Sequence, residues 1–186
     1  MSTRPHALPA AAVPVWDPLV RVLHWTLAAA VLVGYATGDD GGKWHERIGY
    51  VALAAAGLRI LWGFAGSARA RFADFVPSPH GLNEYVRVLV ARREPRYVGH
   101  NPLGGAWIVV MLALVIATGA SGWSLAMLGE DEYEWLEDLH EGLAGTLLAA
   151  AAIHVTGVAW ESLRHGENLV RAMFTGRKRA PRPGDR

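Results

Sequence analysis

The sequence contains no cysteine. This absence excludes disulfide bonds, thiolate metal sites, iron–sulfur clusters and the covalent haem attachment made through a C-x-x-C-H motif. The chain also lacks an excess of either charge, because 18 basic and 17 acidic residues leave a net charge of +1. The positions of the charges along the chain are therefore more informative than their sum. We expect no nucleic-acid partner.

The apolar residues, which make up 52% of the 186 positions, are gathered into long blocks. Each block is long enough to cross a bilayer, which takes about 20 helical residues. No small-residue cleavage site follows the first block, so we expect it to be kept as a membrane span. We predict an all-α membrane four-helix bundle, with spans at about 18–37, 44–64, 103–127 and 138–163.

Three segments are expected along the chain. Residues 1–15 are predicted to form a flexible arm, 16–165 the four-span domain and 166–186 a basic tail. Asp17 followed by Pro18 is typical of a helix start, with aspartate as the N-cap and proline in the first turn. A short amphipathic helix is predicted over 82–90, inside the long connection between the second and third spans.

The basic residues indicate how the spans are oriented, because loops on the cytoplasmic side carry an excess of Lys and Arg. The connection over 66–102 has six arginines and the stretch from 164 onward has seven basic residues, whereas the loop at 129–138 has none. Both termini and the long connection are therefore expected in the cytoplasm. The protein is expected to be a multi-pass protein of the cytoplasmic (inner) membrane, in contact with membrane lipid.

Four histidines lie within the predicted spans. His140 and His154 are fourteen residues apart on the fourth span, which places them on one helix face about 21 Å apart. From the direction of each span, His45 is expected at the depth of His140, near the outer side. His24 is expected at the depth of His154, nearer the cytoplasm.

Ionisable residues inside a membrane are costly and by default suggest function. Two imidazoles from facing helices can hold a b-type haem between them. Two alternatives remain open. The histidines could be core residues hydrogen-bonded to neighbouring helices, or ligands of zinc or copper, although the inner level has no carboxylate or thiolate to complete such a site. Two haems fit better.

Several short motifs accompany the histidines: LHW (23–25), WHERIG (44–49), RILWG (59–63), GHNPLG (99–104), NLVRAM (168–173) and TGRKR (175–179). Together with the pair His140 and His154, they resemble the bacterial cytochrome b-561 family. The resemblance extends over nearly the whole chain from about Val15. This family is also similar to the membrane cytochrome b subunits of nickel–iron hydrogenases.

The resemblance implies two haem b groups, with ligands at His24, His45, His140 and His154. It also implies electron exchange between quinone and a donor or acceptor at the outer face of a bacterial inner membrane. That partner would be a periplasmic c-type cytochrome or a dehydrogenase. One branch of the family instead acts alone, oxidising superoxide and reducing ubiquinone. A non-redox membrane bundle that carries histidines is a further alternative.

Basic residues near the span ends are candidate partners for the haem propionates, which are anionic. Arg59 is the candidate on the inner side, and Lys43 and Arg47 are the candidates on the outer side, where they would also attract a small anion. The alternative for Arg59 is snorkelling to lipid headgroups, and for Lys43 and Arg47 it is a plain interfacial anchor.

His100 and Asn101 precede the third span and are a possible quinone site, together with Arg21 at the start of the first span. The competing interpretation makes Asn101 and Pro102 a helix start and His100 an exposed loop residue. For Arg21, propionate binding and snorkelling are the other interpretations. The acidic loop at 129–138 could dock a basic partner or simply be solvated.

Overall fold

The computed structural model describes residues 12–38, 42–128 and 133–186. Most of the arm predicted for 1–15 and half of the acidic residues of the loop at 129–138 lie outside the described residues. The four histidines and all the candidate basic residues lie within them.

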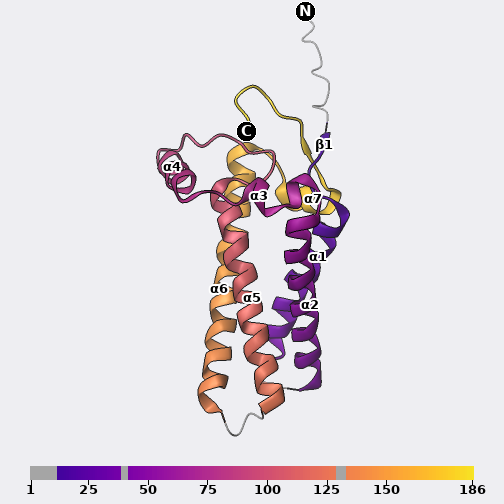
Figure 1. Ribbon diagram of the computed structural model, residues 1–186. Helices are drawn as coiled ribbons and strands as arrows, with labels where there is room; N and C mark the ends of the chain where they lie inside the picture. The colour runs from indigo at the N-terminus through magenta and orange to yellow at the C-terminus, as the bar shows by residue number, and fades with distance from the viewer. Residues whose placement is uncertain (1–11, 39–41, 129–132) are drawn as a thin grey trace, which may run out of the picture.

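Four long helices run side by side and form the body of the molecule (Figure 1). They are α1 (Pro18–Ala36), α2 (Lys43–Ala65), α5 (Pro102–Leu128) and α6 (Glu134–His165). All four are long and apolar enough to cross a membrane. Their bounds agree with the predicted spans to within a few residues, except that α6 begins at Glu134 rather than at 138.

Local sequence explains where these helices begin and end. The Asp17 carboxylate accepts a hydrogen bond from the backbone amide of Val20 (2.9 Å), and proline occupies the first turn of α1. At the other end of the chain, Gly166 closes α6 with φ of 60°. Glycine adopts this left-handed conformation without the penalty that a Cβ would bring.

The helices pack in chain order. α1 lies against α2, α2 against α5 and α5 against α6, while α1 and α6 contact each other more sparsely. A small apolar core of Ala56, Leu112, Val115 and Leu147 lies between them. Large apolar side chains such as Leu61 and Phe64 are exposed on the outer surface. An apolar exterior is expected of a bundle surrounded by lipid.

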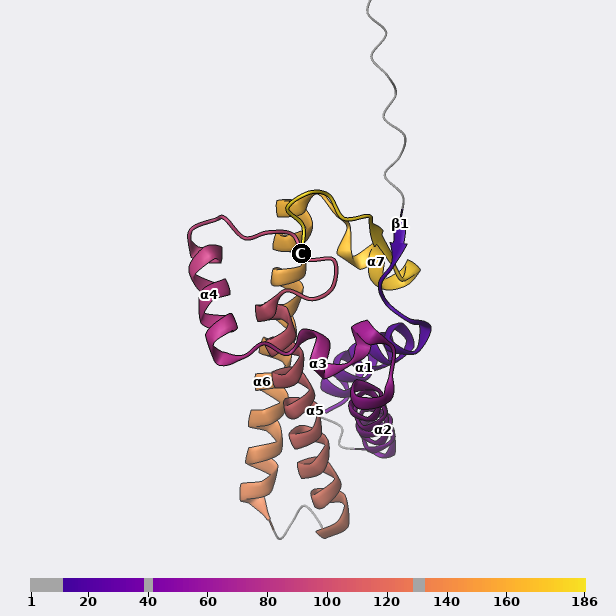
Figure 2. The same ribbon diagram turned by 45° about the horizontal axis from the view of Figure 1, so that its top comes forward.

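The remaining elements gather at one end of the bundle (Figures 1 and 2). They are β1 (Ala12–Pro14), η1 (Ala68–Ala70), α3 (Phe72–Phe75), α4 (Pro79–Val90), α7 (Leu169–Thr175) and β2 (Arg177–Arg179). We call this the terminal end, and the opposite end, where α1 ends and α2 begins, the loop end. α4 starts three residues before the helix predicted at 82–90, because Ser78 caps it by accepting a hydrogen bond from the Gly81 amide (3.1 Å).

The C-terminal tail folds back onto the terminal end. β2 pairs with β1 in antiparallel register, with Ala12 opposite Arg179, and the Val98 amide donates to the Arg186 carbonyl oxygen (2.7 Å). No pattern in the sequence predicts this pairing. It joins the end of the predicted arm to the predicted tail, so these two segments form one cap.

A buried ionic network fixes the tail in place. The guanidinium of Arg96, with only 4% of its side chain exposed, donates to Glu167 (2.9 Å) and Asp185 (2.7 Å). It also donates to the carbonyl oxygen of Arg179 (2.8 Å). Bidentate guanidinium–carboxylate pairs are strong because both donors are geometrically matched to the acceptor. One arginine therefore ties the connection to the end of α6 and to the tail.

Replacing Arg96 with alanine should destabilise the terminal end by about 3 kcal/mol, because two buried carboxylates lose their cation. Thermal unfolding of the detergent-solubilised protein measures the change. Arg93→Ala removes an exposed arginine of the same connection and serves as the control. Equal melting temperatures for the two variants would contradict a stabilising role for the network.

Candidate functional site

One face of α6 carries the polar residues that face the rest of the bundle. His140, Leu147, His154 and Glu161 follow one another at intervals of seven residues, so they form a single stripe along the helix. Leu147 is part of the apolar core, and the two histidines lie on either side of it. The stripe thus holds one imidazole towards each end of the bundle.

His140 faces His45 of α2 at the loop end. Their ring centres are 5.9 Å apart, and the two rings are nearly perpendicular at 86°. The Nδ1 atom of His45 lies 3.0 Å from the Gly34 carbonyl oxygen, and Nδ1 of His140 lies 3.0 Å from the Thr118 carbonyl oxygen. A carbonyl oxygen only accepts, so Nδ1 carries the proton in both rings. Each Nε2 is therefore left with a free lone pair, as a metal ligand requires.

His154 faces His24 of α1 towards the terminal end. Their ring centres are 6.3 Å apart and the rings are inclined at 55°. Nδ1 of His24 is buried and has no hydrogen-bond partner among the described residues. Trp25 contacts the same ring edge to face at 5.0 Å. The four histidines thus meet in two pairs, each with one member on α6.

The spacing of both pairs suits a metal held between two imidazoles. Metal–imidazole bonds are about 2 Å long, so two rings that bind one metal from opposite sides have centres about 6 Å apart. Over the described ranges, no three His, Asp or Glu side chains gather as a metal site. A metal bound by only two protein ligands needs the rest from elsewhere, and a haem macrocycle supplies four. The donor set therefore fits haem.

A glycine of α5 lies directly beside one of the histidine rings. Both pairs bridge from α6 to α1 or α2, and α1 and α6 contact each other sparsely. On α5, a Cβ at Gly122 would lie 2.8 Å from Cε1 of His140. Glycine is thus required at 122 for the His140 ring to occupy its position.

Arg59 and Arg21 lie towards the terminal end. Arg59 is only 6% exposed, and its guanidinium lies over the rings of Phe72 (5.6 Å) and Phe75 (5.7 Å). Arg21 is half-buried against Gly176, where an added Cβ would come within 2.7 Å of its Nη1. In the described structure, Nη1 of Arg59 and Nε of Arg21 are buried without a hydrogen-bond partner. Burial of this extent argues against simple snorkelling for Arg59.

Lys43 and Arg47 lie at the loop end, in the first turns of α2. Both side chains are exposed, and the Arg47 guanidinium lies 5.2 Å from the ring centre of Trp44. The structure does not bring them into a cluster with the other basic candidates. Both remain compatible with an interfacial anchor or with an anion site.

His100 and Asn101 have different roles in the structure. Asn101 starts α5, because its side-chain oxygen accepts from the Gly104 amide (2.6 Å). His100 is not an exposed loop residue, since its ring packs between Trp16 (4.5 Å) and Phe75 (4.8 Å). Burial, and then the charges of nearby basic groups, lower the pKa of His100 to about 3, so its imidazole is neutral near pH 7.

Sequence reasoning missed Glu161, which lies two turns beyond His154 on the same stripe. Its carboxylate accepts from Asn101 (2.9 Å) and Tyr85 (3.3 Å) and lies 3.2 Å from the His165 ring. Burial, and then the charge of Glu161, raise the pKa of Tyr85, so this hydroxyl stays protonated as a donor. The heptad spacing from His154 was the signal that would have found Glu161.

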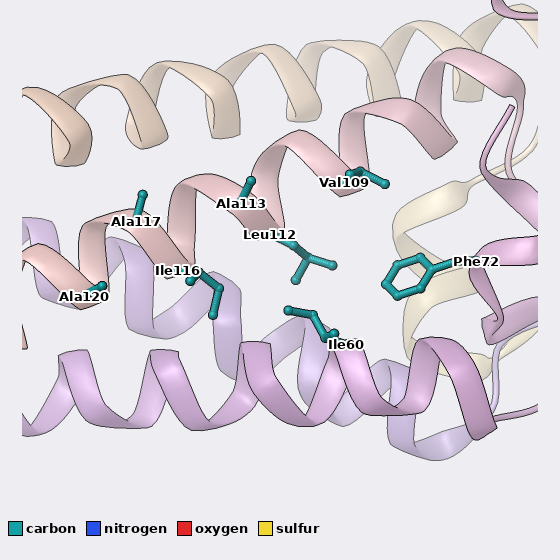
Figure 3. Close-up of a pocket in the computed structure, with 8 residues that line it drawn as sticks. All are labelled: Ile60, Phe72, Val109, Leu112, Ala113, Ile116, Ala117 and Ala120. Atoms are coloured by element: carbon teal, nitrogen blue, oxygen red, sulfur yellow. The ribbon is translucent and has the colours of Figure 1, made fainter. Parts of the chain in front are cut away.

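A wholly apolar pocket lies apart from both histidine pairs, between α2 and α5 (Figure 3). Its volume is about 440 Å³. Its lining residues are Ile60, Phe72, Val109, Leu112, Ala113, Ile116, Ala117 and Ala120. Phe72 closes the pocket at the terminal end (Figure 3) and also contacts Arg59. The pocket suits a hydrocarbon chain.

Comparison with known families agrees with this arrangement. Residues 15–176 match the family model of prokaryotic cytochrome b561. The chain belongs to this family. The family resemblance predicted from the short motifs is therefore confirmed. The chain is a multi-pass membrane b-type cytochrome that functions in electron transfer.

The cytochrome b561 chain is also similar to three curated proteins, each named a probable Ni/Fe-hydrogenase B-type cytochrome subunit. The protein from Bradyrhizobium diazoefficiens is 25% identical over 88% of this chain and 85% of its own length. The protein from Rhizobium leguminosarum bv. viciae is 23% identical over 88% of this chain and 87% of its own length. The protein from Rhodobacter capsulatus is 25% identical over 88% of this chain and 80% of its own length. No solved structure matches the chain.

Gly122→Ala should push the His140 ring out of its position and reduce haem binding in this cytochrome b561, because the added methyl group would clash with Cε1. Haem content per chain, measured on the purified protein, tests this. Gly142→Ala is the matched control, since an added Cβ there meets nothing within 4 Å in the described structure and Gly142 faces away from His140. Unchanged haem content in both variants would contradict the steric argument.

Proposed function

We propose that this cytochrome b561 binds two b-type haems and carries electrons across the bacterial cytoplasmic membrane, between a redox partner at the periplasmic face and the quinone pool. The observation that carries the proposal is the division of four histidines into two pairs, with ring centres 5.9 Å and 6.3 Å apart. The haems would supply the one-electron chemistry.

The histidine pairs would ligate the two haems from different helices. His45 and His140 would hold one at the loop end, and His24 and His154 would hold the other towards the terminal end. The fourteen residues between His140 and His154 correspond to about 21 Å of helix. This spans most of the hydrocarbon core of a bilayer, which is about 30 Å thick.

The proposed orientation puts the terminal end in the cytoplasm. The connection over 66–102 and the tail over 166–186, which gather there, carry 12 of the 18 arginines and lysines of the chain, which supports a cytoplasmic location. The loop end would then face the periplasm, with Lys43 and Arg47 exposed beside the haem of His45 and His140. They would pair there with its propionates.

A quinone would react near the cytoplasmic side. The apolar pocket between α2 and α5 suits an isoprenoid tail, and Phe72 connects it to Arg59. His100 and Asn101 lie on the same side of the bundle, although Asn101 is engaged as the cap of α5. Arg59 and the neutral His100 ring are therefore better placed than Asn101 to contact a quinone headgroup.

The external partner is proposed to be a redox protein rather than a small molecule. The three similar proteins are named as subunits of Ni/Fe-hydrogenases, which favours a relay that works with a hydrogenase, another dehydrogenase or a c-type cytochrome. If the purified chain alone consumed superoxide near the diffusion limit and reduced its haems, the relay proposal would fail in favour of a superoxide:ubiquinone oxidoreductase.

His140→Ala and His154→Ala should each remove a different haem, since each substitution leaves one intact pair. A pyridine haemochrome assay should give about two b haems per chain for the wild type and about one for each variant. Low-temperature difference spectra should then show that the two variants retain different α-bands. If one substitution removed both haems, or neither did, the proposed pairing would be wrong.

A further inference from the structure

The C-terminal tail places a lysine inside the cap. Lys178 is the middle residue of β2 and lies opposite Val13 of β1. It is only 7% exposed, whereas the neighbouring Arg177 is exposed. Lysine is almost never fully buried unless its charge is paired. The surroundings of this ammonium group therefore indicate what it does.

Lys178 has weak partners for a buried cation. Its Nζ donates to the Gly99 carbonyl oxygen at 3.3 Å and lies 5.3 Å from the ring centre of Trp16. No carboxylate of the described residues forms an ion pair with it. Burial lowers the pKa of Lys178 to about 8, so the group still carries its charge near neutral pH. An ammonium group has three donors, and at least two of these are free for a ligand.

A continuous row of rings connects Lys178 to Arg59. Trp16, beneath the ammonium group, packs against His100 (4.5 Å), and His100 packs against Phe75 (4.8 Å). Phe75 in turn contacts the Arg59 guanidinium (5.7 Å). Arg59 is buried with Nη1 unpartnered among the described residues. A cation with free hydrogen-bond donors therefore lies at each end of this row of rings.

A third cation lies beside the tail. Arg21 packs against Gly176, two residues before Lys178. It also precedes His24 by three residues on α1, so both side chains lie on one helix face. Phe174, four residues before Lys178, stacks on Trp25 (4.3 Å), and Trp25 contacts His24 (5.0 Å). The C-terminal segment therefore lies beside this histidine pair.

The carboxylates of this region are occupied by other donors. Asp17 accepts from the Val20 amide and from the Trp62 indole (3.1 Å). Glu161 accepts from Asn101 and Tyr85, and Glu167 accepts from Arg96 and from the Arg179 amide (2.7 Å). Glu167 and Glu161 act on Lys178 only from beyond ion-pair distance, and none of the three cations forms an ion pair with a carboxylate of the described residues, which is costly for buried charge. An anionic ligand would remove this cost.

We propose that the C-terminal tail completes a haem site, with Lys178 binding a propionate of the haem held by His24 and His154, and Arg21 supporting it. This rests on the proposed function, because it requires a haem between those two histidines. The propionates are the only carboxylates that such a haem brings, and charge-assisted hydrogen bonds to them would satisfy the free donors. The tail is then part of the cofactor site as well as a cap.

Lys178→Met tests the proposal on the purified holoprotein. Methionine has a similar length and no charge, so a purely structural lysine could be replaced at little cost or with a gain in stability. A lysine that binds a propionate could not be replaced by methionine without weakening haem binding. We expect a lower midpoint potential for one haem, because a cation nearby favours the reduced form, and roughly tenfold faster loss of that haem to apomyoglobin. Lys178→Arg should restore both.

Arg177→Met is the matched control, because it removes one positive charge from the same tail. It also removes one contact between the strands, the hydrogen bond from Arg177 to the Ala12 carbonyl oxygen (2.8 Å). His154→Ala identifies which haem is affected.

If Lys178→Met and Arg177→Met give the same midpoint potentials and haem-loss rates as the wild type, the propionate assignment is overturned while the two-haem function stands. If the wild type holds no haem there, the proposed function itself fails. Lys178→Gln, which keeps a polar side chain, replaces Lys178→Met should the latter not accumulate.

Discussion

The face of α6 that carries two histidines sets the constraint on which the rest of the bundle depends. Placing an imidazole inside an apolar, membrane-spanning helix costs free energy unless another polar group or a ligand contacts the ring. His45 and His24 provide those partners from two other helices, at two depths. Because α1 and α2 run in opposite directions, one histidine near the start of each is enough to serve both ends of α6. The pair of His24 and His154 is thus formed between α1 and α6, two helices that contact each other sparsely.

Long-range polar contacts hold the terminal end together where apolar packing is thin. The outer surface of the bundle is apolar and its core is small, so the helices alone bury few large side chains. The Arg96 network and the pairing of β1 with β2 join segments that are more than 70 residues apart. The cap is therefore ordered by ion pairs and backbone hydrogen bonds, and it covers the end of the bundle where His24 and His154 lie.

The spans and the pairing of the histidines were predictable because they depend on short-range rules, namely hydropathy, helical rise and the placement of basic residues. The cap was not predictable on those rules. Lys178, Glu167 and Asp185 acquire their contacts only when the tail folds back, and no periodicity signals that return. The burial of His100, for which an exposed position was one of two interpretations, was unpredictable for a related reason, since it depends on Trp16 and Phe75 from distant segments.

The two histidine pairs are fixed by different physics. At the loop end, backbone carbonyl oxygens of Gly34 and Thr118 orient the rings through Nδ1, which raises the basicity of each imidazole. At the terminal end, aromatic packing holds His24, and buried cations lie nearby. A more basic ligand favours the oxidised metal, whereas a nearby cation favours the reduced one. If haems bind at the two pairs as proposed, their imidazole ligands would differ in basicity and in the charges nearby.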